Sequence, residues 1–373
     1  MSSVDAVVDR GKRVERYLKR RIFGVLAGSG SREGAGTRVD LRAVRRVLFV
    51  RVNVRLGNLL LITPAIASVR LALPQARIDV LCDAAYGCIL SSDPFVDRVV
   101  GIDRRTMRDP LAMAALVHRL RRRRYDLVVE GARGGSFLGA VLTGLTAGHV
   151  RVASVGGRYG RFFNVLVPRG RRPHKVDLLL DLLAGIGIPS RSSELRMVLT
   201  DAERATAAGR WRSWGVPPRR AVVGINLGGR GSKRWPVERF AELARRIASC
   251  ADVSVALLGG PEDRDSLVQV AAHLPRDVVV PPELPVREFA ALLATCAAVV
   301  TADTGPMHLA AAVGTPTVAV MQAEKSVDYA PRGPGHRTVH ALGGPSVERV
   351  LAAVDEALRD RQGDDQRVLA SPV

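Results

Sequence analysis

The stretch Thr301-Ala302-Asp303-Thr304-Gly305-Pro306-Met307-His308-Leu309-Ala310-Ala311-Ala312-Val313-Gly314-Thr315-Pro316 lies between two apolar runs. One run ends at Val300, and the other extends from Thr317 to Met321. Short apolar runs that are bounded by glycine and proline are typical of buried strands. The order therefore predicts a strand, a tight loop, a short helix and a second strand, which is the repeating unit of a parallel α/β sheet.

The helix within this stretch carries start and stop signals. Asp303 or Thr304 can cap it, and Pro306 suits its first turn, where an N–H would have no partner in any case. Gly314 can adopt the left-handed conformation that ends a helix. The N–H groups of the first turn face the carboxyl edge of the predicted sheet, so we predict a phosphate site there. The alternative is that Asp303 and Thr304 are only caps and that His308 is an interior histidine.

Two further loops, residues 228–235 and 259–262, follow apolar runs of their own and fall on the same predicted edge. They offer glycine N–H groups, the cations of Lys233 and Arg234, and Glu262 as an acceptor for ribose hydroxyls. Neither a Walker A pattern nor a Gly-x-Gly-x-x-Gly fingerprint is present. The three loops together nevertheless fit a nucleoside diphosphate.

The N-terminal half repeats the same alternation of strands and helices. The apolar run Val47–Val52 leads through Gly57-Asn58 into a helix that opens with Leu59-Leu-Leu-Ile-Thr63-Pro64. One strand about every 25 to 30 residues indicates doubly wound parallel sheets. The expected strands are 47–52, 77–82, 96–102, 125–130, 221–226, 253–258, 278–280, 298–301 and 317–321.

A chain of 373 residues is expected to form two domains. Polar, proline-containing sequence around residues 191–220 interrupts the pattern and marks the connection between them. The predicted divisions are an N-terminal helix and linker (1–43), a first Rossmann-like domain (44–195), a connection (196–218), a second Rossmann-like domain (219–345), and a closing helix near 346–359 with a polar, disordered tail (to 373).

The composition points to an anionic partner. The formal net charge is +20, whereas aromatic residues make up only 4% of the chain. Nucleic acid, an anionic membrane and phosphorylated substrates all fit this charge. We expect no nucleic acid, because no recognition motif or aromatic stacking surface accompanies the charge. The arginine run 121–124 is interpreted as a solvated helix end or as a contact for an anionic acceptor.

Residues 4–27 place apolar side chains at helical spacing, with arginine and lysine largely on the other faces. This basic amphipathic helix either docks on anionic lipid headgroups or packs on the domain as an ordinary helix or loose tail. The four cysteines show no metal spacing, and neither a signal peptide nor an apolar run long enough to span a membrane is evident. We therefore expect a cytoplasmic protein, with peripheral contact to the inner face of the plasma membrane left open.

Four motifs together resemble glycosyltransferase family 9, the ADP-heptose:lipopolysaccharide heptosyltransferase family. The resemblance extends from about Arg45 to about Thr338, and its last motif is the most specific. The motifs are Gly57-Asn58-Leu-Leu-Leu-Ile-Thr63-Pro64, Ile225-Asn226 with Lys233-Arg234-Trp235-Pro236-Val237-Glu238-Arg239-Phe240, Leu257-Leu258-Gly259-Gly260-Pro261-Glu262, and Asp303 to Ala311 with Gly314-Thr315-Pro316.

The resemblance implies a GT-B fold, in which two Rossmann-like domains face each other across a cleft. It also implies inverting transfer of a sugar from a nucleoside diphosphate, with ADP-heptose as the expected donor, to a glycan or glycolipid acceptor, without a cofactor or an obligatory metal. Lys233 is expected at the phosphate or sugar, and Glu262 at the ribose. The implied donor residues are Asn226, Lys233, Arg234, Glu262, Asp303, Thr304, Gly305, Pro306, Met307 and His308. The implied acceptor residues are Arg55, Gly57 and Thr63.

One departure from the family concerns catalysis. The family commonly has Gly-Asp where this chain has Gly57-Asn58, and that aspartate is taken to be the general base. An amide cannot accept a proton in this way. Either another carboxylate serves, with Glu130 and Asp83 as candidates, or the reaction depends on leaving-group stabilisation by Lys233 and the helix terminus, or the chain is inactive. The candidate catalytic residues are Asn58, Lys233 and Glu130.

A second departure follows the strand that ends at Met321. The family often has Phe-Gly-Pro-Thr there, whereas this chain has Gln322-Ala-Glu-Lys-Ser326. Lys325 either adds a phosphate contact or is a surface lysine. We expect a glycosyltransferase that acts on a cell-envelope or secondary-metabolite acceptor. The alternative is a weak or inactive paralogue that binds a nucleotide sugar or a partner protein.

Overall fold

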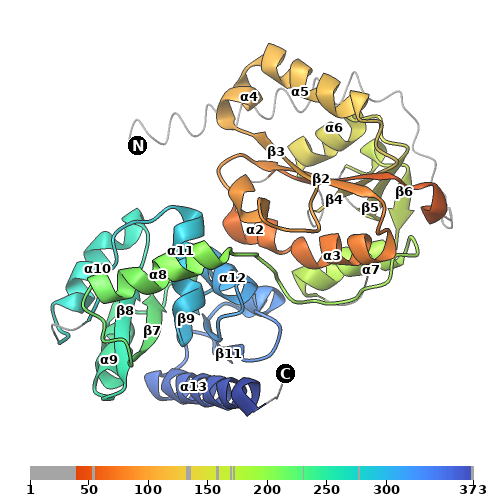
Figure 1. Ribbon diagram of the computed structural model, residues 1–373. Coiled ribbons are helices and arrows are strands. Elements are labelled where there is room, and N and C mark those ends of the chain that lie inside the picture. Colours follow the sequence, from red (N-terminus) through yellow and green to blue (C-terminus); the bar gives the residue numbers. More distant parts are fainter. Residues whose placement is uncertain are drawn as a thin grey trace.

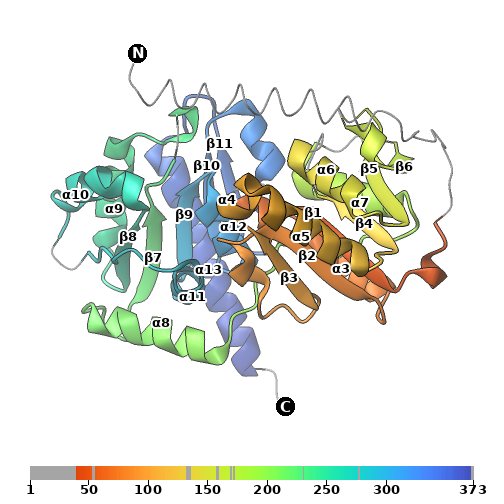
Figure 2. The same ribbon diagram turned by 90° about the horizontal axis from the view of Figure 1, so that it is seen from above.

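The computed structural model describes residues 39–370, except for 53–54, 132–135, 157–158, 169, 171–172, 230 and 276–277. The predicted N-terminal helix and linker therefore lie outside the described residues. The described chain forms two α/β domains, which Figure 1 shows in orange to yellow-green and in green to blue. Viewed from above, the two parallel sheets lie in separate lobes (Figure 2).

The first domain is built on a six-stranded parallel sheet. Its strands are β1 (Arg46–Arg51), β2 (Arg77–Asp83), β3 (Arg98–Ile102), β4 (Leu127–Glu130), β5 (Val150–Ser154) and β6 (Val165–Val167). They lie in the order β3-β2-β1-β4-β5-β6. This order reverses direction between β1 and β4, which pair in register from Val47 with Leu127 to Val50 with Glu130. The loops after β1 and β4 therefore open the crevice where such sheets bind ligands.

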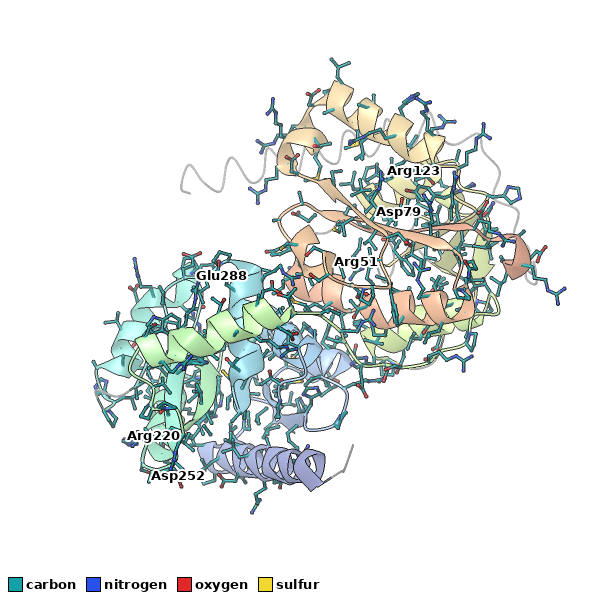
Figure 3. The ribbon with its side chains drawn as sticks, viewed as in Figure 1. Arg51, Asp79, Arg123, Arg220, Asp252 and Glu288 are labelled. Carbon is teal, nitrogen blue, oxygen red and sulfur yellow. The ribbon has the colours of Figure 1, made fainter. Side chains whose placement is uncertain are left out.

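Helices cover both faces of this sheet. They are α2 (Leu56–Leu60), α3 (Thr63–Ala72), α4 (Arg104–Arg108), α5 (Pro110–Arg122), α6 (Phe137–Leu145) and α7 (Lys175–Ala184), with short 3-10 turns η1 (Leu41–Ala43), η2 (Gly87–Leu90) and η3 (Gly160–Phe162). Because both faces are covered, β1 is buried along Val47–Val50, which explains its unbroken apolar sequence. One buried carboxylate, Asp79 on β2, accepts a hydrogen bond of 2.7 Å from the Tyr125 hydroxyl (Figure 3).

The second domain is built on a five-stranded parallel sheet. Its strands are β7 (Ala221–Asn226), β8 (Val253–Leu258), β9 (Ala298–Ala302), β10 (Thr317–Met321) and β11 (Arg337–His340). They lie in the order β11-β10-β9-β7-β8, which reverses direction between β7 and β9. Its helices are α9 (Val237–Ala248), α10 (Arg264–Ala271), α11 (Val286–Thr295), α12 (Gly305–Ala312) and α13 (Val347–Ala370), with η4 (Gly231–Lys233), η5 (Pro261–Asp263) and η6 (Glu324–Tyr329).

The structure corrects several expectations. Residues 278–280 form no full strand, because only Val279 bridges to Ala256, in the parallel direction. The strands β5, β6 and β11 were not predicted, since β6 and β11 have only three and four residues and β5 contains Arg151. The expected disordered tail is wrong as far as Ala370, because α13 continues that far and no proline interrupts it before Pro372.

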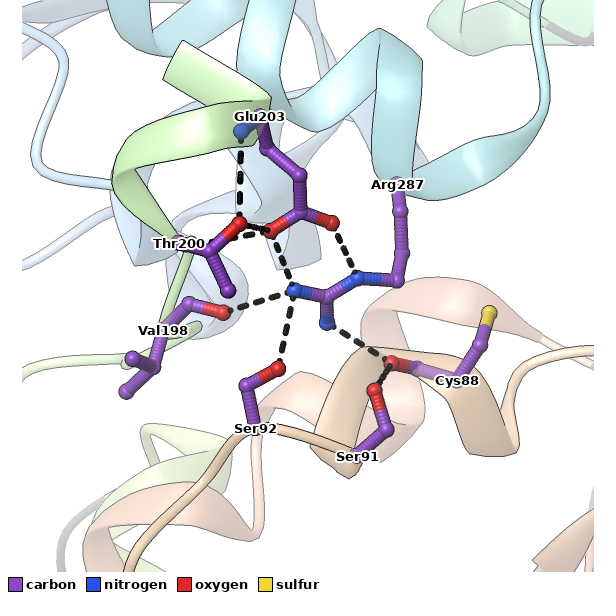
Figure 4. Close-up of polar contacts among 7 residues, drawn as sticks. All are labelled: Cys88, Ser91, Ser92, Val198, Thr200, Glu203 and Arg287. Atoms are coloured by element: carbon purple, nitrogen blue, oxygen red, sulfur yellow. Dashed lines mark hydrogen bonds and ion pairs between the residues drawn. The ribbon is translucent and has the colours of Figure 1, made fainter.

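An extended segment, residues 189–200, and the helix α8 (Asp201–Ser213) connect the domains. Arg287 on α11 fastens this connection to both domains (Figure 4). Its guanidinium forms hydrogen bonds with the Glu203 carboxylate at 2.6 and 2.8 Å and with the Val198 carbonyl at 3.1 Å. It also donates to the Cys88 carbonyl at 2.8 Å and to the Ser92 hydroxyl at 3.2 Å in the first domain.

A second set of contacts joins the start of α7 in the first domain to residues 328–332 of the second. Three side chains of the first domain bond to every second residue of this segment, at positions 328, 330 and 332. The bonds are His174 Nε2 to Ala330 O at 2.9 Å, Lys175 Nζ to Asp328 Oδ2 at 2.7 Å, and Arg332 to both carboxylate oxygens of Asp177 at 2.6 and 2.7 Å. The two carboxyl edges are therefore held facing each other.

Candidate active site

The helix α12 begins where the sequence predicts, with Thr304 at its N-cap position and Pro306 in its first turn. The Thr304 hydroxyl makes no capping bond to this helix, because it lies 3.3 Å from Ala302 O and 3.2 Å from Thr301 Oγ1. Gly314 has a φ of 82°, the left-handed conformation expected after the helix. The first turn of α12 thus presents N–H groups that its own cap does not use, which favours an anion at this position.

His308 lies one turn into α12, at the junction between the domains. Its ring packs so closely on Gly57 of α2 that a Cβ at Gly57 would lie 2.3 Å from His308 Cδ2. Burial lowers the pKa of His308 to about 4, although the nearby Asp303 carboxylate acts in the opposite direction. His308 is therefore neutral at pH 7. Its Nδ1 atom is buried and has no hydrogen-bond partner among the described residues.

Asp303 holds Lys233 instead of capping the helix. Lys233 Nζ lies 2.6 Å from Asp303 Oδ2, and the Ser326 hydroxyl donates a 2.8 Å hydrogen bond to the same oxygen. The Asp303 side chain is only 6% exposed, whereas the Lys233 side chain is 42% exposed. Lys233 is therefore a partly accessible cation whose present partner is a buried carboxylate. Lys325, which the sequence also singled out, lies beside Ser326 in η6 and is exposed.

A second cation is held in a similar way. Arg234 Nη2 lies 2.6 Å from Asp263 Oδ1, and Asp263 Oδ2 accepts a 3.1 Å hydrogen bond from the Gly260 N–H. Asp263 was not predicted, although it directly follows Glu262, which is exposed. Asn226 is buried, and its amide donates to Thr301 Oγ1 at 3.1 Å, so it joins β7 to β9 beneath the edge.

The structure places the predicted acceptor residues in different surroundings. Arg55 is exposed, and Gly57 packs on His308 as described. Thr63 is buried, and its hydroxyl donates to Leu60 O at 2.8 Å and accepts from the Arg196 N–H at 3.0 Å. Thr63 thus fastens the interdomain segment to α3. Asn58 is partly exposed on α2.

The two carboxylates considered as bases lie at the carboxyl ends of β4 and β2. Glu130 is buried, and its Oε1 accepts a hydrogen bond of 3.3 Å from the Ser136 N–H at the start of α6. Asp83 is also buried, and its Oδ1 accepts a 2.9 Å bond from the Ala85 N–H, which forms a local turn. Glu130 lies beside β1, whose end leads to Asn58, and is therefore at the switch point of the sheet.

Tyr329, at the end of η6, is a site residue that the sequence did not single out. Its ring centre lies 4.7 Å from Lys175 Nζ, 5.6 Å from Lys233 Nζ and 6.4 Å from the His308 ring centre. A cation from each domain therefore contacts one tyrosine ring. The unusual sequence after Met321 marked this loop, but nothing in the pattern indicated Tyr329 itself.

Within the described residues, no group of three or more histidine, cysteine, aspartate or glutamate side chains could hold a metal ion. In the same part of the chain, no helix has both the length and the apolar composition needed to cross a membrane.

The chain is similar to known proteins in sequence and in fold. The sequence profile of glycosyltransferase family 9 (heptosyltransferase) matches residues 113–348. Lipopolysaccharide heptosyltransferase 2 of Escherichia coli K12 is 27% identical over 279 residues, which are 69% of this chain and 77% of that protein. Lipopolysaccharide heptosyltransferase 3 of E. coli is 25% identical over 294 residues, which are 74% and 83% of the two chains.

Solved structures share the fold. The glycosyl transferase family 9 protein of Veillonella parvula DSM 2008 has a TM-score of 0.77 at 20% identity, covering 85% of this chain and 98% of that one. The E. coli ADP-heptose lipopolysaccharide heptosyltransferase II has a TM-score of 0.69 at 22% identity, covering 84% and 99%. Together with the two parallel-sheet domains, these likenesses confirm the predicted GT-B fold.

Proposed function

Because this chain belongs to glycosyltransferase family 9 and is a glycosyltransferase, we propose that it transfers a heptose or related sugar from a nucleoside diphosphate, with ADP-heptose as the first candidate donor. The observation that carries this proposal is the free first turn of α12 beside Lys233. A diphosphate needs positive charge and N–H donors at short range, and this corner of the second domain offers both.

In the proposed reaction, the acceptor oxygen attacks the anomeric carbon from the face opposite the diphosphate, so the configuration inverts. The bond to the diphosphate oxygen breaks as the new glycosidic bond forms, and the acceptor proton passes to a base. Lys233 and the helix terminus stabilise the charge that develops on the leaving diphosphate. We assign the base to Glu130, which lies at the switch point, where β4 pairs with β1. No metal ion is required in this scheme.

The proposed acceptor is an anionic glycan or glycolipid of the cell envelope, bound by the first domain. Exposed arginines on α4, α5 and the turn after α5 support this choice, and Leu111 in the first turn of α5 is 82% exposed. The exposed arginines are Arg104, Arg105, Arg108, Arg119, Arg121, Arg122 and Arg124. Arginine near an anionic lipid surface contributes about 1 kcal/mol per residue. Co-sedimentation with vesicles of anionic and of neutral lipid tests this, and equal binding to both would contradict it.

The donor proposal is tested by calorimetric titration of ADP, UDP and GDP, with and without Mg²⁺. We expect one diphosphate to bind equally well in both conditions, and Lys233→Ala to weaken it strongly. Lys325→Ala is the matched control, since Lys325 lies on a neighbouring loop but is exposed. If no nucleoside diphosphate binds to the wild-type protein, the proposal fails.

Asn58 favours a second candidate function, a weak or inactive paralogue that binds a nucleotide sugar or a partner protein. This candidate predicts that ADP binds but that no sugar is transferred. It also predicts that Asn58→Asp creates an activity that the wild type lacks. A wild type that turns over its donor eliminates the second candidate.

A further inference from the structure

Arg51, the last residue of β1, is a cation buried inside the first domain. It is 8% exposed, and burial lowers its pKa, although the charges of Glu130 and Tyr329 act in the opposite direction. A buried cation costs several kcal/mol unless its donors are satisfied. The fold retains this one at the end of β1, at the switch point of the first sheet and at the position labelled in Figure 3.

The guanidinium of Arg51 joins two elements that β1 alone would not connect. Its Nε donates a 3.0 Å hydrogen bond to the carbonyl of Asn58 on α2. Its Nη1 donates to the carbonyl of Gly131, the residue that follows Glu130 at the end of β4. The planar fork of arginine can serve both carbonyls in fixed directions, whereas the ammonium of lysine cannot reproduce that geometry.

The element that Arg51 holds is also the one that touches the donor helix. Gly57 of α2 packs on His308, and a Cβ at Gly305 would lie 3.1 Å from Leu56 Cδ2. The turn of α2 therefore meets the first turn and the histidine of α12 at two consecutive residues. Any shift of α2 moves Asn58 and the contact with His308 together.

We infer that Arg51 is a positioning residue, which fixes the α2 turn between the end of β4 and the donor helix so that acceptor and donor meet in a reactive arrangement. This inference rests on the proposed function. The residue itself does not touch the reacting atoms. Misplacement by about 1 Å can lower a rate by roughly 10²-fold, so a small displacement of α2 has a large kinetic effect.

Arg151 on β5 provides a matched control within the same sheet. Its Nε donates to Phe162 O at 2.9 Å and its Nη1 to Gly148 O at 2.7 Å, so it also serves two carbonyls. Burial lowers its pKa, as for Arg51. It lies on β5, which is separated from β1 by β4, and contacts neither α2 nor the second domain in these bonds. Lysine at either position keeps the positive charge but removes the planar guanidinium, which donates to two carbonyls at once.

The experiment compares Arg51→Lys with Arg151→Lys. Both are expected to lower the thermal midpoint, and Arg151→Lys is expected to leave ADP affinity within about threefold. Only Arg51→Lys is expected to lower kcat, by about 10- to 10²-fold, and to raise KM for the acceptor. If kcat of Arg51→Lys stays within threefold of the wild type, or if Arg151→Lys loses as much, the inference is overturned.

Hydrogen exchange separates this inference from the proposed function, because it needs no turnover. Arg51→Lys should speed amide exchange in peptides that cover residues 56–60 and 305–309, whereas Arg151→Lys should speed it only near residues 148–162. Unchanged exchange at 56–60 in Arg51→Lys contradicts the inference, whatever the enzyme transfers.

Gly131→Ala is the second variant and approaches the contact from the other side. Its new Cβ would lie 2.9 Å from Ile62 Cγ2 and 3.4 Å from Arg51 Cδ. The same faster exchange at 56–60 is expected, and its absence in both variants also counts against the inference.

Discussion

Each of the two sheets has a switch point, but the charged groups at the two switch points differ. At the switch point of the second domain, Lys233 and Arg234 each lie 2.6 Å from a carboxylate, and the helix N-terminus is free of its own cap. At the switch point of the first domain, the cation is Arg51, which is buried and bonded to backbone carbonyls. Glu130 there accepts from a backbone N–H.

This difference indicates that the two domains use their charged groups for different purposes. The second domain has two partly exposed cations, Lys233 and Arg234, each paired with a carboxylate. The first domain uses its cation to hold backbone in place and keeps a carboxylate beside it. In our proposal, the cations of the second domain bind the diphosphate of the donor, whereas Arg51 of the first domain holds the backbone in place and Glu130 accepts one proton.

The largest expected effect comes from removing that carboxylate. Glu130→Gln keeps the size of the side chain and its ability to accept from the Ser136 N–H. If Glu130 is the base, kcat should fall by roughly 10²- to 10⁴-fold. ADP affinity should stay unchanged, since the donor residues belong to the other domain. Steady-state kinetics and calorimetry measure both quantities.

Asp83→Asn is the control for this change, because Asp83 is also buried at the carboxyl edge but lies on β2. It should leave kcat within about tenfold, below the usual range for loss of a general base. Adding Asn58→Asp to Glu130→Gln should recover part of the activity, since it places a carboxylate on the α2 turn. A Glu130→Gln enzyme with normal kcat would assign the base elsewhere.

The local structure of the second-domain part of the candidate site could be predicted from the sequence, whereas that of the first-domain part largely could not. Pro306 and Gly314 fix α12 through local backbone preferences, and these act within a few residues. Asp263 and Tyr329 depend on loops that meet only in the folded chain, so no local pattern marks them. Thr63 lies in a readable motif, but its bond to Arg196 N spans 133 positions and could not be anticipated.

The next prediction tests whether activity requires the close contact between α2 of the first domain and α12 of the second. In Gly57→Ala, the added methyl carbon would lie 2.3 Å from His308 Cδ2, and His308 is only 5% exposed, so the domains must separate locally. We expect kcat to fall by about 10- to 10²-fold, as for a misplacement of about 1 Å. ADP affinity should also fall, because His308 belongs to the donor helix.

Gly209→Ala is the control for Gly57→Ala. Gly209 lies on the connecting helix α8, and a Cβ there would meet nothing within 4 Å. Alanine in an open helical position should raise stability by about 0.5–1 kcal/mol without changing kcat. Equal kinetics for the two variants would show that close contact between α2 and α12 is not needed.

The smallest expected effect concerns the charge of Glu203 on the connecting helix α8, which pairs with Arg287 on α11. Hydrogen bonds from Arg287 lower the pKa of Glu203 from its ordinary 4.5 to about 2. Between these two pH values, the unfolded chain binds more protons than the folded one. The stabilisation is therefore complete above about pH 4.5 and is lost as the pH falls toward 2.

Glu203→Gln removes this charge and should lower the thermal midpoint at pH 7 by about 2–4 °C, for a loss near 1 kcal/mol. The difference in thermal midpoint between Glu203→Gln and the wild type should disappear as the pH falls below 4.5, the ordinary pKa of Glu203. Glu288→Gln is the matched control, because Glu288 pairs with Arg210 on the same helices but its side chain is 42% exposed. Exposed ion pairs contribute about 0–1 kcal/mol to stability, so the thermal midpoint of Glu288→Gln should change little at any pH. Parallel acid curves for both variants and the wild type would mean that Arg287 joins the domains through its bonds to Cys88 and Val198 and not through the charge of Glu203.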